Sequence, residues 1–180
     1  ADKSILRLGP ESQAELETAE FKGEGRKVTA KVVVGQAWAT VSTALGGGDK
    51  FEVTTARAVA GVRGTSFRVD AMKDTSVTVK VFAGSVAVAG NSVPSLEHQA
   101  PAQPPAKGEK PKRVQVAGPH QVSKAEWEKL VGAMMQVSVS ATGEMTTGAL
   151  ASNECADEFS KWNHERDKVP CVITPPGGSK

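Results

Sequence analysis

Tyrosine is absent from this chain of 180 residues, and only three tryptophans and five phenylalanines are present. Valine and alanine must therefore fill most of any hydrophobic core. The formal net charge is +2 with a pI near 8.6, whereas dedicated nucleic-acid binders usually have clustered Lys and Arg and a pI above about 9. No run of about 18 apolar residues occurs either. We therefore expect neither nucleic acid as a partner nor a membrane span.

Side-chain patterns that carry chemistry are also missing. The three histidines, His98, His120 and His164, lie far apart, and none has a His or Cys partner at metal-ligand spacing. His164 lies in a polar run and is expected on a helix surface. No serine lies in a Gly-x-Ser-x-Gly motif, and the glycines at 46–48 lack the Lys-Ser/Thr of a phosphate-binding loop. We predict no catalytic, metal or cofactor site, and no enzyme.

Cysteine is scarce, and the two that occur leave two interpretations open. Cys155 and Cys171 are compatible with one disulfide and an oxidising compartment, or with two free thiols in a cytosolic protein. The first residues, Ala1-Asp2-Lys3, match what remains after a signal peptide is removed at a small-residue site. These residues are therefore compatible with export but do not require it.

Valine-rich segments separated by glycine dominate the first half of the chain. In residues 77–81, Val alternates with Thr and Lys, which is typical of a strand with one solvated face. Gly35 is expected to break one valine-rich run. The predicted strands are Thr29–Val34, Gln36–Val41, Phe51–Thr55, Ala58–Val62, Thr65–Asp70, Val77–Val81 and Ser85–Val88. We predict a mainly β domain over residues 1–92, either a β-sandwich or a short β-solenoid.

The remainder divides into a proline-rich segment and a small C-terminal region. Six of the ten prolines lie within 94–119, so 93–119 is predicted to be a linker or an extended strap. Its basic side chains, Lys107, Lys110, Lys112 and Arg113, are either solvated or a docking site for an acidic surface.

Residues 120–180 are predicted to form a small α/β region with two helices. Ser123 and Glu126 match a capping box, and apolar residues follow at helical spacing, namely Trp127, Leu130, Val131 and Met134. A short strand over Val137–Ser140 ends at Thr142-Gly143, and a second helix is expected from about Asn153 to Lys168.

One segment resembles a known family. The stretch from Phe51 to Val69 contains Val-Ala-Gly-Val-Arg-Gly-Thr-x-Phe, which is similar to the signature of the FecR-like domain family, with Arg57 in place of the usual proline. The resemblance covers about residues 4–90. The residues that carry it are Gly61, Val62, Arg63, Gly64, Thr65 and Phe67. We interpret this motif as a structural turn in which Gly61 and Gly64 allow a positive φ or a close backbone approach.

The resemblance implies an all-β module without catalytic residues, located in the periplasm or outside the cell and used in protein contacts. The best-known members resemble periplasmic sensors joined to a membrane helix and a cytoplasmic anti-sigma region, and neither part is evident here. Export in turn favours a disulfide between Cys155 and Cys171.

Family members usually have a further strand unit before the segment that begins at Leu6, so we expect an open sheet edge here. Ile5, Leu6 and Leu8 are then candidate assembly contacts. The predicted function is a non-enzymatic, extracytoplasmic protein-interaction module that needs no cofactor. Its partner is a protein, and a second copy of the chain is one candidate. The alternative is a structural subunit of a fibre or homo-oligomer built by edge-strand complementation. Glycan binding through Trp162 is a third hypothesis.

Overall fold

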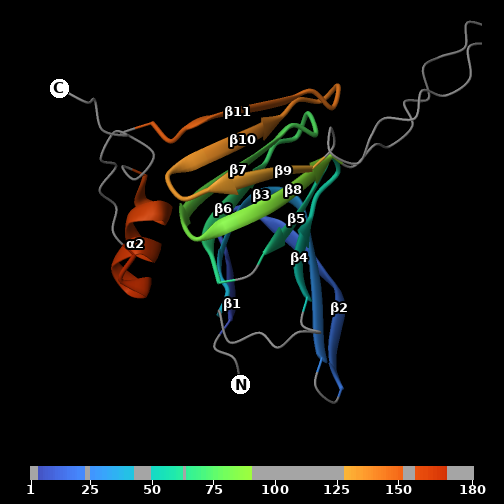
Figure 1. Cartoon of the computed structure of the whole chain (residues 1–180), viewed down its shortest axis with the longest axis vertical. Coiled ribbons are helices and arrows are strands. Elements are labelled where there is room, and N and C mark those ends of the chain that lie inside the picture. The colour runs from blue at the N-terminus through green and yellow to red at the C-terminus, as the bar shows by residue number, and fades with distance from the viewer. Residues whose placement is uncertain are drawn as a thin grey trace, which may run out of the picture.

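The computed structural model describes residues 4–22, 25–42, 50–62, 64–90, 128–151 and 157–169 (Figure 1). The strands are β1 (Ile5–Leu8), β2 (Gln13–Lys22), β3 (Gly25–Thr40), β4 (Lys50–Thr54), β5 (Ala58–Val62), β6 (Ser66–Ala71), β7 (Val77–Ala83), β8 (Ser85–Gly90), β9 (Glu128–Gly132), β10 (Met135–Val139) and β11 (Met145–Ala149). The helix within the described residues is α2 (Glu158–Asp167). No helix within these ranges has both the length and the apolar composition to cross a membrane. The mainly β prediction is confirmed.

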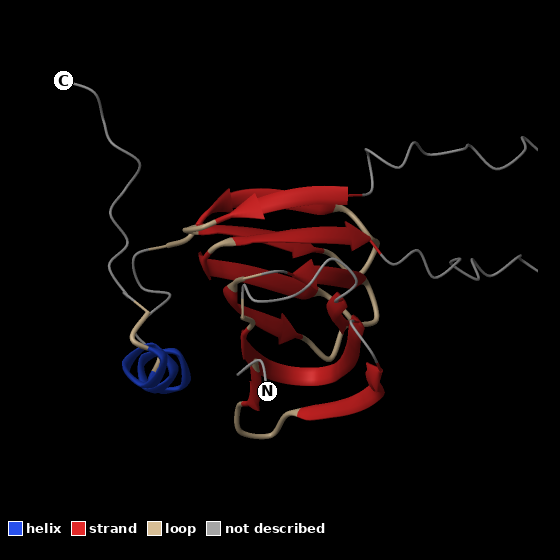
Figure 2. Cartoon of the chain, turned by 60° about the horizontal axis from the view of Figure 1, so that its bottom comes forward, coloured by secondary structure: helices blue, strands red, loops and turns tan. Residues whose placement is uncertain are grey.

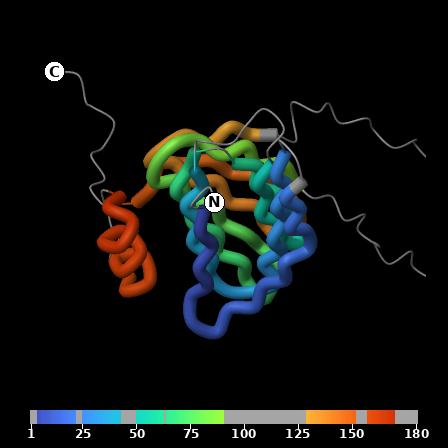
Figure 3. Tube along the Cα trace, turned by 90° about the horizontal axis from the view of Figure 1, so that it is seen from below, coloured from blue at the N-terminus to red at the C-terminus, as the bar shows by residue number. Residues whose placement is uncertain are grey.

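The strands form two sheets that share β3 and wrap around one core (Figures 2 and 3). Sheet A has the strand order β1-β3-β6-β7-β10-β11, and sheet B has the order β2-β3-β4-β5-β8-β9. All pairs are antiparallel except β3 with β4. The helix α2 lies to one side of the sheets in Figure 2. The result is a β-sandwich with nearly barrel-like closure.

Strand β3 passes from sheet B to sheet A at Gly35. This glycine has φ +99°, and a Cβ added there would lie only 2.6 Å from the Cα of Ser12. Before the bend Ala30 and Val32 face the core, and after it Ala37 and Ala39 do, so the alternation shifts by one residue. The expected break at Gly35 is therefore a bend in one long strand, which only a residue without Cβ accommodates without strain.

The core between the sheets consists mostly of valine and alanine, as the composition predicts. Strand β7 shows the alternation, with Val77, Val79 and Val81 buried and Thr78 and Lys80 on the opposite face. The phenylalanine buried most completely in this core is Phe67, with no exposed surface.

One predicted helix is wrong. Residues 128–132 form β9, which pairs with β8, and Met134 lies in the following turn with φ +61°. Val131 is fully buried while Leu130 is 75% exposed, which is the alternation of a strand rather than one helical face. Pairing with the free edge of β8 outweighs the local helical spacing, and Gly132 weakens the helix intrinsically. The capping box lies outside the described residues.

The other C-terminal predictions have mixed outcomes. The short strand is confirmed as β10, and the second helix is confirmed as α2, which begins at Glu158. Strands β2 and β11 were not predicted. Strands β9, β10 and β11 extend the two sheets that the first half of the chain begins. The proline-rich segment, the pair Cys155 and Cys171, and Arg63 lie outside the described residues.

Candidate functional site

The family motif forms the turn between β5 and β6. Gly64 has φ +65°, whereas Gly61 lies inside β5, and a Cβ added to it would meet nothing closer than 3.9 Å. The expected backbone role therefore holds for Gly64 and not for Gly61. Thr65 and Phe67 are buried, and the Thr65 hydroxyl donates to the carbonyl oxygen of Ser85 at 2.8 Å. Val62 is also buried. The bond from Thr65 to Ser85 joins the β5–β6 turn to the β7–β8 turn at Gly84.

The candidate assembly residues of β1 lie at the end of sheet A. Strand β1 pairs with β3, with Ile5 opposite Thr40 and Leu8 opposite Ala37. Ile5 and Leu8 are 41% and 43% exposed, and Leu6 packs against the core. The described part of the chain pairs β1 with no second strand, so it is an edge strand.

The outer face of sheet A carries a row of cationic and aromatic side chains. Arg7 lies opposite Trp38, Trp38 opposite Arg68, and Arg68 opposite Lys80, on the successive strands β1, β3, β6 and β7. We name these four residues the cationic row. Because neighbouring strands lie about 4.8 Å apart, the row brings three positive charges within about 15 Å. Like charges directly opposite one another are unfavourable unless anions compensate them.

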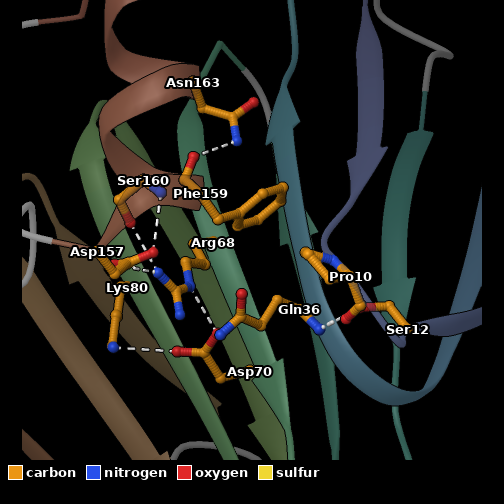
Figure 4. Close-up of polar contacts among 10 residues, drawn as sticks. All are labelled: Pro10, Ser12, Gln36, Arg68, Asp70, Lys80, Asp157, Phe159, Ser160 and Asn163. Carbon is orange, nitrogen blue, oxygen red and sulfur yellow. Dashed lines mark hydrogen bonds and ion pairs between the residues drawn. The ribbon is translucent and has the colours of Figure 1, made fainter.

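The middle of the row is held by two aspartates (Figure 4). The Asp70 carboxylate accepts from Arg68 Nε at 2.6 Å and from Lys80 Nζ at 3.0 Å. Arg68 Nη1 then donates to Asp157 and to the Ser160 hydroxyl, both at 2.7 Å. Asp157 is also the N-cap of α2, and it accepts from the Ser160 backbone N–H at 3.0 Å. The same carboxylate thus starts the helix and attaches it to the sheet.

The C-terminal end of α2 binds the Arg7–Trp38 end of the row. Asp167 accepts two hydrogen bonds from Arg7, at 2.7 and 2.8 Å, one from Trp38 Nε1 at 2.9 Å and one from Thr40 at 2.6 Å. Burial would raise the pKa of Asp167, but these donors outweigh it and lower the pKa to about 2. Arg7 also donates to Asn163 at 3.1 Å.

An aromatic cluster lies between these two attachments. The rings of Trp38 and Phe82 stack at 4.8 Å, and His164 of α2 meets both edge-on, at 4.8 and 4.6 Å. His164 is only 4% exposed, and burial lowers its pKa. The expectation that His164 lies on the helix surface is therefore wrong. The helix turns this side chain toward the sheet, where the aromatic rings cover it.

We name the whole contact between α2 and sheet A the polar seam. Its buried ionic groups are engaged with one another, and no cluster of three metal-ligating residues occurs within the described ranges. The arrangement can therefore hold a helix by directional charge contacts. Sequence reasoning missed the seam, because Arg7 and Asp167 are 160 positions apart and nothing local connects them.

A second feature lies on the outer face of sheet B. Gly61, Ala87 and Leu130 lie opposite one another on β5, β8 and β9. These residues line a hollow of about 350 Å³, in which Gly61 and Ala87 are small and Leu130 is 75% exposed. The hollow is lined by Lys50, Phe51, Gly61, Val62, Ser85, Ala87 and Leu130. We name it the sheet B hollow.

The fold and these two surfaces define a β-sandwich domain with a helix attached through charged groups. Residues 1–87 match the family model described as FecR protein, so this part of the chain is a FecR-type region and the resemblance is confirmed. No curated protein matches the chain.

Two solved structures share the fold. Both are crystal structures of a protein described as a "putative anti-sigma factor" from Parabacteroides distasonis ATCC 8503, with TM-scores of 0.54 and 0.53 and sequence identities of 21% and 20%. The match covers 86% of this chain and 55% of each of those chains. The chain thus spans about half the length of these solved structures.

Proposed function

We propose that this chain is a non-enzymatic, extracytoplasmic protein-interaction module of the FecR type. The observation that carries the proposal is the sheet B hollow with Leu130 beside it. Leu130, 75% exposed, lines this concave surface together with Gly61 and Ala87, and an apolar centre of this kind can receive a side chain of a partner protein. The description of the structural relatives as anti-sigma factors supports a regulatory protein as the partner.

The composition of the hollow fits a protein partner. Gly61, Ala87 and Leu130 supply its apolar surface, whereas Phe51 and Val62, which also line it, belong to the core behind the sheet. Lys50 and Ser85 supply polar groups at its border. An apolar centre with a polar rim is the usual anatomy of a protein–protein interface. We expect an apolar side chain of the partner to enter the hollow above Gly61 and Ala87, where a larger residue would fill the space.

Site-specific photo-crosslinking in the producing cells tests this proposal. A crosslinking amino acid at position 130 should give one discrete protein adduct, whereas the same group at Val33 should give none. Val33 is the matched control because it is a 43% exposed valine of β3 that does not line the hollow. Leu130→Glu should remove binding of the captured protein without destabilising the fold. Absence of an adduct at 130 would contradict the proposal.

The extracytoplasmic location is part of the same proposal. It is supported by the FecR-type region, and it predicts a disulfide between Cys155 and Cys171. Cell fractionation should find the chain outside the cytoplasm, and thiol titration of the denatured, unreduced protein should find no free thiol. Two free thiols in a cytoplasmic fraction would contradict this location.

Edge strands favour a second candidate, the structural subunit. Sheet A ends in β1 on one side and β11 on the other, so β1 of one copy adding to β11 of the next would continue the sheet. Strand β11 has no charged residue and no proline, and its register with β10 is regular throughout. Natural edge strands usually carry charges, proline or a bulge, which prevent pairing with another chain, and β11 has none of these. The edge strand β2, by contrast, contains glutamates and two register shifts.

Light scattering and negative-stain microscopy of the purified chain separate the two candidates. The subunit predicts large oligomers or filaments that Thr147→Lys abolishes, since this change puts a charge on the exposed edge of β11. The interaction module predicts a monomer that Thr147→Lys leaves unchanged.

A further inference from the structure

The polar seam differs in composition from the rest of the interior. The residues of α2 are Glu, Phe, Ser, Lys, Trp, Asn, His, Glu, Arg and Asp, so the helix contains no aliphatic side chain. The side chains that it buries are Ser160, Asn163 and His164. On the sheet it meets Arg7 and Arg68, and its Phe159 packs against the small buried cluster of Trp38, Phe82 and Leu150. Aromatic and arginine side chains surrounded by ion pairs are typical of contacts between separate proteins rather than of a domain core.

The cationic row is arranged in advance for an acidic ligand. Asp70 binds the Nε side of Arg68 and leaves Nη1 directed at α2. With α2 left aside, the row and Asp70 carry three positive charges and one negative charge, around the stacked rings of Trp38 and Phe82. Such a surface attracts carboxylates, and its aromatic centre favours a helix that can also cover the rings.

The helix supplies the complementary charges at its two ends. Asp157 and Asp167 are ten positions apart, which is about 15 Å along an α-helix. They meet Arg68 on β6 and Arg7 on β1, the two arginines that flank Trp38 in the row. An isolated helix of ten residues is marginal in water, so α2 depends on these contacts for its structure.

We propose that the cationic row is an acceptor surface for an acidic helix, that α2 occupies it within the molecule, and that a helix of a partner protein with two carboxylates about ten residues apart displaces α2. This inference rests on the proposed interaction function and assigns a second surface and a partner chemistry to it. The sheet B hollow and the cationic row lie on different sheets, so either can fail without the other.

A peptide with the sequence of residues 156–170, labelled with fluorescein, serves as the probe for exchange. The full chain with Asp157→Asn and Asp167→Asn should release its own helix, and it should bind this peptide at least tenfold more tightly than the wild-type chain. The indole N–H signal of Trp38, which donates to Asp167, should shift on release and return when the peptide binds. Fluorescence anisotropy and nuclear magnetic resonance of the same samples give both readouts.

Matched variants separate charge recognition from general effects. A chain with Glu158→Gln and Glu165→Gln loses the same charge from the same helix, but these side chains are exposed and no ion pair with the row involves them. It should bind the peptide no better than the wild-type chain. A peptide carrying Asp157→Asn and Asp167→Asn should not bind any chain.

Four results would overturn the proposal. The first is an unchanged Trp38 signal in the Asp157→Asn, Asp167→Asn chain. The second is a released helix without tenfold gain in peptide affinity, and the third is equal binding of the Asn peptide. The fourth is a dimer that exchanges α2 between copies, which would make a second copy the occupant. If the double variant does not fold, Asp167→Asn alone provides the same comparison. An adduct at position 130 alongside any of these results would retain the proposed function.

Discussion

Where α2 covers it, sheet A is buried on both of its faces, and the two faces use different chemistry. Its inner face contributes Val69, Val79 and Val81 to a core of valine and alanine, whereas its outer face offers Arg68 and Trp38 to α2. Arg68 is 4% exposed and Trp38 is fully buried, so the sheet side of the polar seam is as buried as the core, whereas the Asp157 side chain at its edge is 42% exposed. Apolar burial is non-directional and supplies stability, while paired buried charges contribute little net stability and fix geometry.

This comparison suggests that the core and the seam respond differently to substitution. The core should tolerate changes that conserve volume and fail when volume is lost. The seam should fail when one charge is removed, because its partner is left buried without compensation. Loss of the core should unfold the domain, whereas loss of the seam should release only α2.

Truncation of the core should give the largest effect. Phe67→Ala removes a fully buried ring, and we expect the free energy of unfolding to fall by about 3–5 kcal/mol. Urea denaturation followed by circular dichroism measures this loss. Val33→Thr, at a 43% exposed position, should change it by no more than about 0.5 kcal/mol. A loss below about 1 kcal/mol for Phe67→Ala would place the ring outside the cooperative core.

A substitution where the β5–β6 and β7–β8 turns meet should give the next largest loss of stability. Gly84 has φ +81°, and a Cβ added there would lie 2.4 Å from the carbonyl oxygen of Gly64. Gly84→Ala should therefore cost about 2–4 kcal/mol of unfolding free energy. Gly61→Ala is the control in the same motif, and it should change stability by less than about 1 kcal/mol. Equal losses from both changes, measured by urea denaturation, would contradict this assignment.

Removal of one charge from the seam should act locally. Asp167→Asn weakens the bonds that Arg7, Trp38 and Thr40 donate, and hydrogen bonds to charged groups contribute about 1.5–3 kcal/mol. Hydrogen exchange should show that the amides of α2 lose protection while those of β6 and β7 keep theirs. Glu165→Gln should leave the protection of α2 unchanged. Equal loss of protection in the strands would mean that seam and core form one cooperative unit.

Acidification should weaken the seam in two steps without unfolding the core. Burial lowers the pKa of His164, so docking is favoured while His164 is neutral and begins to weaken as the pH falls through the ordinary value of 6.5. The pKa of Asp167 is lowered from 3.8 to about 2, so its contribution is fully present above 3.8 and is lost as the pH falls toward 2.

The Trp38 indole signal, followed against pH, measures both steps. His164→Gln should abolish the first step and retain the second. A docking contact that is stronger at pH 5 than at pH 7 would contradict the assigned direction for His164.

Local patterns predicted much of the sheet framework. The valines of β7 alternate with polar residues, and the glycine-containing motif marks the turn at Gly64, because these signals depend on neighbours in the chain. The apolar spacing of Leu130, Val131 and Met134 misled because it fits one face of a helix, whereas Leu130 lies on the exposed face of β9. Strands β2 and β11 were missed, although residues 13–22 do alternate in part, because alanine and threonine give a weak signal.

Alternation and glycine placement are enough to indicate a valine-rich β domain with a FecR-type motif, because both follow from the geometry of a strand and a turn. Two features become visible only in the folded chain: β9 extends sheet B, and one row under α2 is formed by Arg7, Trp38, Arg68 and Lys80. Strand register and helix docking depend on partners from four separate segments of the chain. The charges of α2 acquire their roles only when the fold brings those segments together.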